Sequence, residues 1–310
     1  MSPPGSRDAP RTPRATFCGL LLLAAATLLL EVALTRILSV TLWYHFAFMV
    51  ISTALFGLGF AGVLLALRRD PARVSARLLA ACALATPAAF VAGYAWFNLV
   101  PFEPFSLGSD GIQWLYLPLS YLAVTLPFLC AGATIAALLT RHAASVHRLY
   151  LFDLVGAGIG SLLVVWLLPW LGGSSTVFAA AALAAAAAVL VCREHRPGWS
   201  WAAAGMAVVL LALAPWAGRL VPVRISSNKV VGGGPHARPV AEVLADPAFW
   251  RHTSWNTLSR IDVIEYRDRR GGVHRNVLID AGTAVTRMAH PEGPLDSLGP
   301  TGDEESFFFR

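Results

Sequence analysis

Charged residues are scarce in this chain: they make up 14% of its 310 residues, whereas hydrophobic residues make up 56%. Soluble domains carry roughly 25% charged residues, so this composition argues against a soluble globular protein. The four cysteines, Cys18, Cys82, Cys130 and Cys192, have neither zinc nor redox spacing, and we predict that they are small buried apolar residues. The sequence also lacks a His-Glu-x-x-His helix and a Gly-x-Ser-x-Gly elbow, so we expect neither a metal site nor serine-hydrolase chemistry.

Long apolar stretches are present instead, and each comes near the roughly 20 residues that cross a hydrocarbon core. The seven stretches are Thr16–Val40, Tyr44–Leu67, Arg77–Val100, Ile112–Thr140, Leu149–Leu171, Ser174–Cys192 and Trp199–Ala217. Because lipid cannot satisfy backbone polar groups, we predict that all of them are helices. The predicted fold is an α-helical polytopic membrane bundle at residues 16–217, followed by a small β-rich module in a soluble tail at residues 218–310.

Arginines follow a positive-inside pattern. They precede the first stretch and lie between the second and third, fourth and fifth, and sixth and seventh stretches. The other loops carry Glu103 and Asp110 or no charge. We therefore predict a multi-pass protein of the cell (inner) membrane with a cytoplasmic N-terminal segment, residues 1–15. Seven spans place the tail outside, but the alanine-rich sixth stretch and the short seventh could form a hairpin or fail to insert, which leaves its side open.

The first stretch could alternatively be a signal peptide, since basic residues precede an apolar run. The run is long, continues past Glu31 and lacks a convincing small-residue cleavage site. We therefore predict an uncleaved first span.

Three charged residues, Glu31, Arg36 and Asp153, stand out within the predicted spans, where a charge costs about 2.5–3.5 kcal/mol and marks a candidate functional site. Glu31 and Asp153 are predicted to lie in opposite halves of the bilayer and not to touch. Arg36 can reach the outer headgroups near His45, and it lies about 140° around the helix from Glu31, which makes a poor ion pair. Two hypotheses remain open: polar contacts that hold helices in register, or a proton or substrate relay.

Glycines recur in two of the spans: Gly57, Gly59 and Gly62 in the second, and Gly156 and Gly160 in the fifth. Small residues let helix backbones approach closely, so we predict that these glycines mark tight helix contacts. No strand precedes them, and a dinucleotide-binding loop therefore has no support.

The tail has the pattern of β structure. Ser259–Tyr266 and Val273–Asp280 largely alternate in polarity around a polar loop that ends in glycines, which predicts a hairpin. A third extended segment is predicted at Thr283–Met288. From Gly218 onward the tail carries 12 Lys+Arg and 11 Asp+Glu, and this balance argues against nucleic-acid binding.

Several of these segments resemble, in their order, the membrane-anchored relatives of spermidine synthase, in which a multi-span region precedes a polyamine aminopropyltransferase-like domain. The resemblance runs from about residue 16 to the end of the chain. It rests on Glu31–Arg36 (EVALTR), Tyr44–His45, the second-span glycines Gly57, Gly59 and Gly62, Tyr150–Gly160 (YLFDLVGAGIG), Ser226–Lys229, Trp255–Val263 (WNTLSRIDV) and Leu278–Thr283 (LIDAGT).

In that family the glycine-rich donor loop, the acidic ribose-binding residue and the catalytic aspartates follow the small β-domain. No glycine fingerprint lies between Gly218 and Arg310, so we assign no catalytic residue and expect a fragment or one half of a split protein. The resemblance implies that a decarboxylated S-adenosylmethionine-type donor binds a downstream or separate domain. Asp280, Asp303 and Glu304 could line the polyamine side of the complete enzyme, or be a strand-end residue and a solvated acidic turn.

A different function class fits the intramembrane charges. A small membrane transporter or export component could use Glu31, Arg36, His45 and Asp153 to line a path, with the tail as an accessory. A structural membrane scaffold is a third hypothesis. Loss of a flux in Glu31→Gln without unfolding would favour the transporter.

Overall fold

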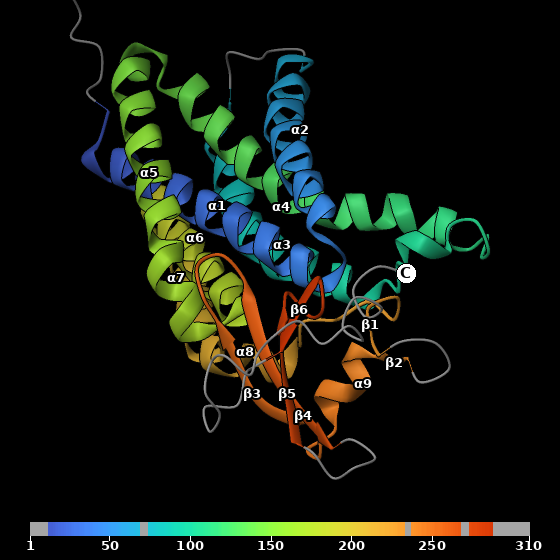
Figure 1. Ribbon diagram of the computed structural model, residues 1–310. Helices are drawn as coiled ribbons and strands as arrows, with labels where there is room; N and C mark the ends of the chain where they lie inside the picture. The colour runs from blue at the N-terminus through green and yellow to red at the C-terminus, as the bar shows by residue number, and fades with distance from the viewer. Residues whose placement is uncertain (1–11, 69–73, 233–236, 268–272, 288–310) are drawn as a thin grey trace, which may run out of the picture.

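In the part of the chain that the structure describes, seven long helices are followed by a small antiparallel sheet (Figure 1). The computed structural model describes residues 12–68, 74–232, 237–267 and 273–287. A helical bundle at the N-terminal side and a β-rich C-terminal part confirm the predicted fold class.

Each long helix begins and ends within a few residues of a predicted stretch. The helices are α1 (Arg14–Thr41), α2 (Ala47–Ala66), α3 (Ala76–Leu99), α4 (Gln113–Arg141), α5 (Val146–Leu171), α6 (Gly173–His195) and α7 (Pro197–Leu213). Among the described residues, seven helical segments, including the sixth and seventh, are long and apolar enough to cross a membrane. The short helix α8 (Ala217–Leu220) forms the end of the seventh segment, Pro197–Leu220.

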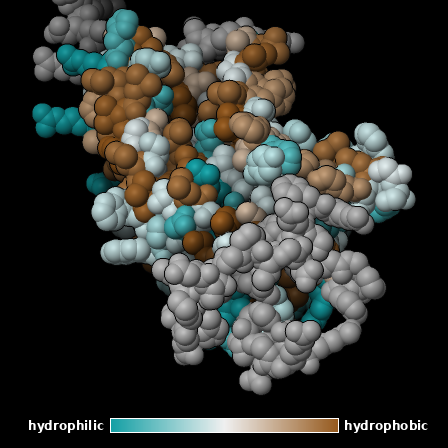
Figure 2. All heavy atoms as spheres, in the orientation of Figure 1, coloured by the Kyte–Doolittle hydropathy of each residue, from teal (hydrophilic) through white to brown (hydrophobic). Residues whose placement is uncertain are grey.

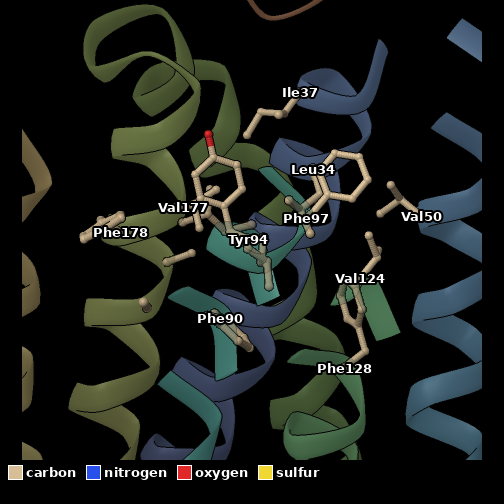
Figure 3. Packing of buried hydrophobic residues seen from close by; sticks show 14 of the residues in the cluster. Leu34, Ile37, Val50, Phe90, Tyr94, Phe97, Val124, Phe128, Val177 and Phe178 are labelled. Atoms are coloured by element: carbon tan, nitrogen blue, oxygen red, sulfur yellow. The ribbon is translucent and has the colours of Figure 1, made fainter. Parts of the chain in front are cut away.

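The alanine-rich helix α6 is the most buried of the seven and packs against α1, α3 and α7. Its small side chains leave room for large residues on its neighbours. Phe90 and Tyr94 of α3 are fully or almost fully buried; Tyr94 lies between Val177 of α6 and Leu34 of α1, and Phe90 lies below it in the same core (Figure 3). Helix α6, which corresponds to the sixth predicted stretch, therefore lies at the centre of the bundle.

The bundle has two chemically different ends, because the helices alternate in direction. At the first end, Thr12 Oγ1 donates a hydrogen bond to Ser145 Oγ (2.9 Å) and Arg141 donates one to the carbonyl oxygen of Val74 (2.7 Å). This basic end carries Arg14, Arg68, Arg77, Arg141, Arg148 and Arg193 at the starts or ends of helices. The sheet lies at the opposite end, where α1, α3 and α5 finish (Figure 1).

The part of the chain after α8 that the structure describes, residues 221–232, 237–267 and 273–287, is called the β-module below. Its main sheet has the order β3 (Trp250–Trp255), β4 (Arg260–Arg267), β5 (Val273–Ile279) and β6 (Ala284–Arg287), all antiparallel. Pairing of β4 with β5 confirms the predicted hairpin. A two-stranded ladder of β1 (Val230–Val231) and β2 (Arg238–Pro239) and the short helix α9 (Val240–Ala245) precede it.

Two parts of the module differ from the sequence prediction. Strand β3 (WRHTSW) was not predicted, because it lacks alternating polarity and contains a β-bulge between Trp250 and His252. Helix α9 was not predicted either. It forms where Val240 and Val243, three residues apart, are both buried against the sheet.

Candidate functional site at the junction of bundle and module

The last turn of α1 belongs to the hydrophobic core of the β-module. Val40 is fully buried there together with Val240 and Val243 of α9, Ile264 of β4 and Leu278 of β5. Separating the module from the bundle would expose this apolar cluster to water, which costs free energy in proportion to its area. The two parts are therefore joined through a shared core.

Lys229 is the only lysine of the chain, and only 1% of it is exposed. Its Nζ donates hydrogen bonds to the carbonyl oxygens of Ser39 (2.9 Å), Val40 (2.8 Å) and Asp280 (2.7 Å), and it lies 3.3 Å from Thr283 Oγ1. One side chain thus connects helix α1 to the turn that follows β5.

These bonds also complete the C-terminus of α1. The last carbonyl groups of a helix have no partner within the helix and need an outside donor. Lys229 Nζ serves Ser39 and Val40, and the backbone N–H of Ser226 donates to the carbonyl oxygen of Thr41 (2.8 Å). A cation at this position is also favoured by the helix dipole.

Asp280 stands at the other side of the same contact, in the turn after β5. Its backbone has a φ of 49°, and Ala281 and Gly282 follow at 54° and 91°, so the chain turns through the left-handed region. One carboxylate oxygen accepts from Ser39 Oγ and the other from the backbone N–H of Arg260, both at 2.9 Å. The structure thus places Asp280 at a strand end with its carboxylate engaged in the junction.

Burial lowers the pKa of Lys229 to about 7, because removal from water disfavours the charged amine. The negative charge of Asp280 acts in the opposite direction, the positive charge of Arg260 lowers the pKa further, and Asp262 raises it. The Nζ atom also lies 5.4 Å from the ring centroid of Trp43. Burial thus brings the pKa of Lys229 closer to neutral pH than that of a lysine in water.

Glu103, in the segment between α3 and α4, makes a second polar contact with the module. Its Oε1 accepts from Arg224 Nη2 (2.7 Å) and from the backbone N–H of Ser227 (3.2 Å), while Oε2 accepts from Ser226 Oγ. The same guanidinium donates to the carbonyl oxygen of Val100, and the backbone N–H of Arg224 donates to Asn98 Oδ1 (3.1 Å). The segment that leads into the sheet is thus held at the end of α3.

Trp255 at the end of β3 makes the third contact. It lies over the tight turn between α5 and α6, where Gly172 has a φ of 79°. A Cβ atom added at Gly173 would come within 3.0 Å of Ile37 and 3.1 Å of the Trp255 ring, so the glycine lets the ring pack closely here. Below, "the junction" means the contacts of Lys229, Glu103 and Trp255 between bundle and module.

Asp262 of β4 lies beside the junction and is fully buried. Its Oδ1 accepts from Thr253 Oγ1 (2.6 Å) and Arg260 Nη2 (2.9 Å), whereas Oδ2 has no partner within the described residues. Most ionisable groups at the junction thus make hydrogen bonds or ion pairs with other residues of the protein. This arrangement is suited to holding the β-module against the helical bundle.

The structure keeps the intramembrane charges apart. Gly160 abuts the backbone of Ala25, so α1 and α5 run side by side, and the rings of Phe17 and Phe152 lie 5.2 Å apart. Asp153 is therefore level with the start of α1, 14 residues or about 21 Å before Glu31.

His45 lies beyond the other end of α1, exposed in the 3-10 turn Tyr44–Phe46 with its ring 4.0 Å from that of Tyr44. Glu31 and Arg36 are both partly exposed on α1, and neither makes a hydrogen bond or ion pair within the residues that the structure describes. The four residues proposed for a transport path therefore do not converge on one site.

The glycines differ in their surroundings. An added Cβ would overlap the backbone of Leu21 at Gly156 and that of Ala25 at Gly160, and at Gly57 it would come within 2.9 Å of the backbone nitrogen of Leu129. Gly59 and Gly62 have no other atom within 4 Å of such a Cβ. They lie about 200° and 140° around α2 from Gly57, so the predicted packing role does not hold for these two within this chain.

No group of three or more His, Cys, Asp or Glu residues in the described part of the chain could hold a metal ion. At the basic end the Nε2 atoms of His142 and His195 lie 3.4 Å apart, but they are only two residues. Asp303 and Glu304 fall outside the described residues.

Sequence reasoning missed the roles of Lys229, Glu103 and Trp255. One signal was available: the chain has 24 basic residues, and Lys229 alone among them is not arginine. Comparisons of the chain with protein-family models, with curated proteins and with solved structures find no match. The resemblance to membrane-anchored relatives of spermidine synthase thus stays a prediction.

Proposed function

We propose that this chain is the membrane anchor and first β-module of an aminopropyltransferase-like protein of the spermidine synthase kind. The transferase chemistry would belong to a domain that lies downstream or on a separate chain. The observation that supports this most is the Lys229 contact, which ties the sheet to the end of α1. An anchor needs such a fixed connection, because a catalytic domain that continues from the sheet is then held at a defined distance from the membrane.

The chemistry of the junction supports a binding role over a catalytic one. The carboxylates of Asp280 and Glu103 both accept hydrogen bonds from groups across the interface, and Lys229 is buried. A catalytic acid, base or nucleophile must reach a substrate atom. The two carboxylates are instead hydrogen-bonded within the protein, and the lysine is shielded from solvent.

The proposal includes an orientation. Arginines gather at the end of the bundle opposite the module, and the positive-inside rule assigns such an end to the cytoplasm. The module and any domain attached to it would then lie on the outer face of the cell (inner) membrane.

Isolation of the protein from native membranes with an antibody against the β-module tests this function. We expect either a band well above 33.1 kDa or a second chain that co-purifies. The isolate should transfer an aminopropyl group from decarboxylated S-adenosylmethionine to putrescine. A single chain of 33.1 kDa without transferase activity would contradict the proposal.

A further inference from the structure

We propose that two copies of this chain associate in the membrane through one exposed stripe of α1, with Glu31 of each copy paired with Arg36 of the other. The inference is independent of the function proposed above, because it rests only on the surface of one helix.

The stripe is the part of α1 that the bundle leaves uncovered. Between Leu28 and the end of the helix only five residues are partly exposed: Leu28, Glu31, Val32, Thr35 and Arg36. Helices α2 and α5 pack against α1 from either side, and α1 is visible between them (Figure 1). Hydrophilic residues interrupt the hydrophobic surface in this region (Figure 2).

The positions of these residues around the helix give the stripe two unlike edges. At about 100° per residue, Arg36 lies about 140° from Glu31. Thr35, Leu28 and Val32 lie about 40°, 60° and 100° from Glu31, which places all three between the two charges. The stripe therefore has an acidic edge, a largely apolar centre and a basic edge.

Both charges lack a partner in the described part of the chain. Arg36 Nε is buried without a hydrogen bond, and Glu31 makes no hydrogen bond or ion pair there. Their separation around the helix prevents a direct ion pair within one copy. Charged residues inside a bilayer are costly and are found paired, so a partner of complementary charge is expected.

A second copy supplies both partners at once. Copies inserted with the same topology are related by an axis along the membrane normal, so their α1 helices point to the same face of the membrane. A two-fold axis through the centre of the stripe places the acidic edge of each copy against the basic edge of the other. Five residues is also the spacing from position g to the next position e in a heptad, where parallel helices form their interchain ion pairs. A lipid phosphate could pair with Arg36 but would leave Glu31 alone.

Disulfide cross-linking in native membranes tests the contact. Cys18, Cys82, Cys130 and Cys192 are replaced by serine, and Val32→Cys is introduced at the centre of the stripe. Val208→Cys on α7 is the matched control, because Val208 is 68% exposed on a different helix. We expect an oxidised dimer for Val32→Cys and none for Val208→Cys. Absence of a dimer at Val32, or equal dimers at both sites, would overturn the proposal.

Charge exchange then tests the pairing. Glu31→Arg alone and Arg36→Glu alone place like charges together in a homodimer, so the cross-linked fraction should fall at least about tenfold. When the two variants are co-expressed with different tags, opposite charges meet at both contacts, and a mixed dimer should form. That recovery also shows that both variants fold.

If the cross-linked fraction is unchanged in Glu31→Arg and in Arg36→Glu, the proposed ion pairs between the two copies are wrong. If neither variant inserts, the double variant Glu31→Gln with Arg36→Gln replaces them. It should also lose most of the cross-link, and a fraction equal to that of the parent protein would overturn the proposal. Pairing with a helix of another protein would leave the single chain monomeric after purification, which likewise contradicts it.

Discussion

The Nζ atom of Lys229 lies 2.7 Å from the backbone carbonyl oxygen of Asp280, although the two residues belong to different elements of the module. The same atom is bonded to two carbonyl groups at the end of α1. This one amine thus links the turn after β5 to the C-terminus of α1, beside the shared apolar core.

Replacing Lys229 by methionine keeps the apolar stem and removes the donor. Three buried carbonyl groups would lose this partner, each at about 1–3 kcal/mol, while the cost of burying the amine disappears. We expect a net loss of about 2 kcal/mol in the free energy of unfolding of the module, measured by denaturant titration with tryptophan fluorescence in detergent. Arg275→Met is the control. Its side chain is 52% exposed, and loss of its surface ion pair with Glu265 should change stability by less than about 1 kcal/mol.

The pKa of Lys229 predicts a dependence of stability on pH. In the folded protein burial lowers the pKa from 10.5 to about 7, so between these values the unfolded chain binds more protons than the folded one. The stability contributed by this group therefore rises as the pH increases from about 7 towards 10. Unfolding measured at pH 7 and pH 9 should show a gain in the wild-type protein that Lys229→Met lacks. An equal gain in both proteins would show that other groups cause it.

The contact of α1 with α5 depends on two glycines. Gly160→Ala places a Cβ against the backbone of Ala25, and we expect a loss of about 1–3 kcal/mol, measured as a lower midpoint of thermal unfolding in detergent. Gly158→Ala is the matched control on the same helix, because no atom of another helix lies within 4 Å of an added Cβ there. It should be neutral or stabilising by up to about 1 kcal/mol. Equal effects of the two changes would contradict the close approach of the helices.

Glu103→Gln tests the second contact of the junction. Arg224, only 24% exposed, would lose its negative partner, and Ser227 N–H would bond a weaker acceptor. We expect the segment from Arg224 to Ser227 to become faster in hydrogen exchange, with a loss of about 1–2 kcal/mol. Glu242→Gln, an exposed glutamate on α9, should leave the exchange of this segment unchanged.

The membrane bundle could be predicted from sequence because each span is recognised from the apolar composition of one short, continuous segment. A stretch such as Leu149–Leu171 is long and apolar whatever its neighbours are, and lipid leaves it no structure other than a helix. The β4–β5 hairpin was accessible for a similar reason, since alternation and a polar loop are short-range patterns. Strand β3 carries no such pattern and is defined by its pairing with β4.

The junction could not be predicted, because its contacts join residues far apart in the chain. Lys229 meets Ser39 across 190 positions, and Glu103 meets Arg224 across 121. The packing of Gly57 and Gly59 likewise depends on a contact with another helix, which the local sequence does not reveal. Both are glycines of one helix, but only the position of α4 decides which of them needs to be small.

Reaction of the single lysine with an amine-specific reagent tests the junction most directly, because Lys229 carries the only side-chain amine in the chain. Labelling is followed by peptide mass spectrometry at pH 8, in the folded protein and after denaturation. We predict that Lys229 reacts at least about 100-fold more slowly in the folded protein, as an opening free energy of about 3 kcal/mol implies. Equal rates in the two states would contradict a buried Lys229 and, with it, the attachment of the module to α1.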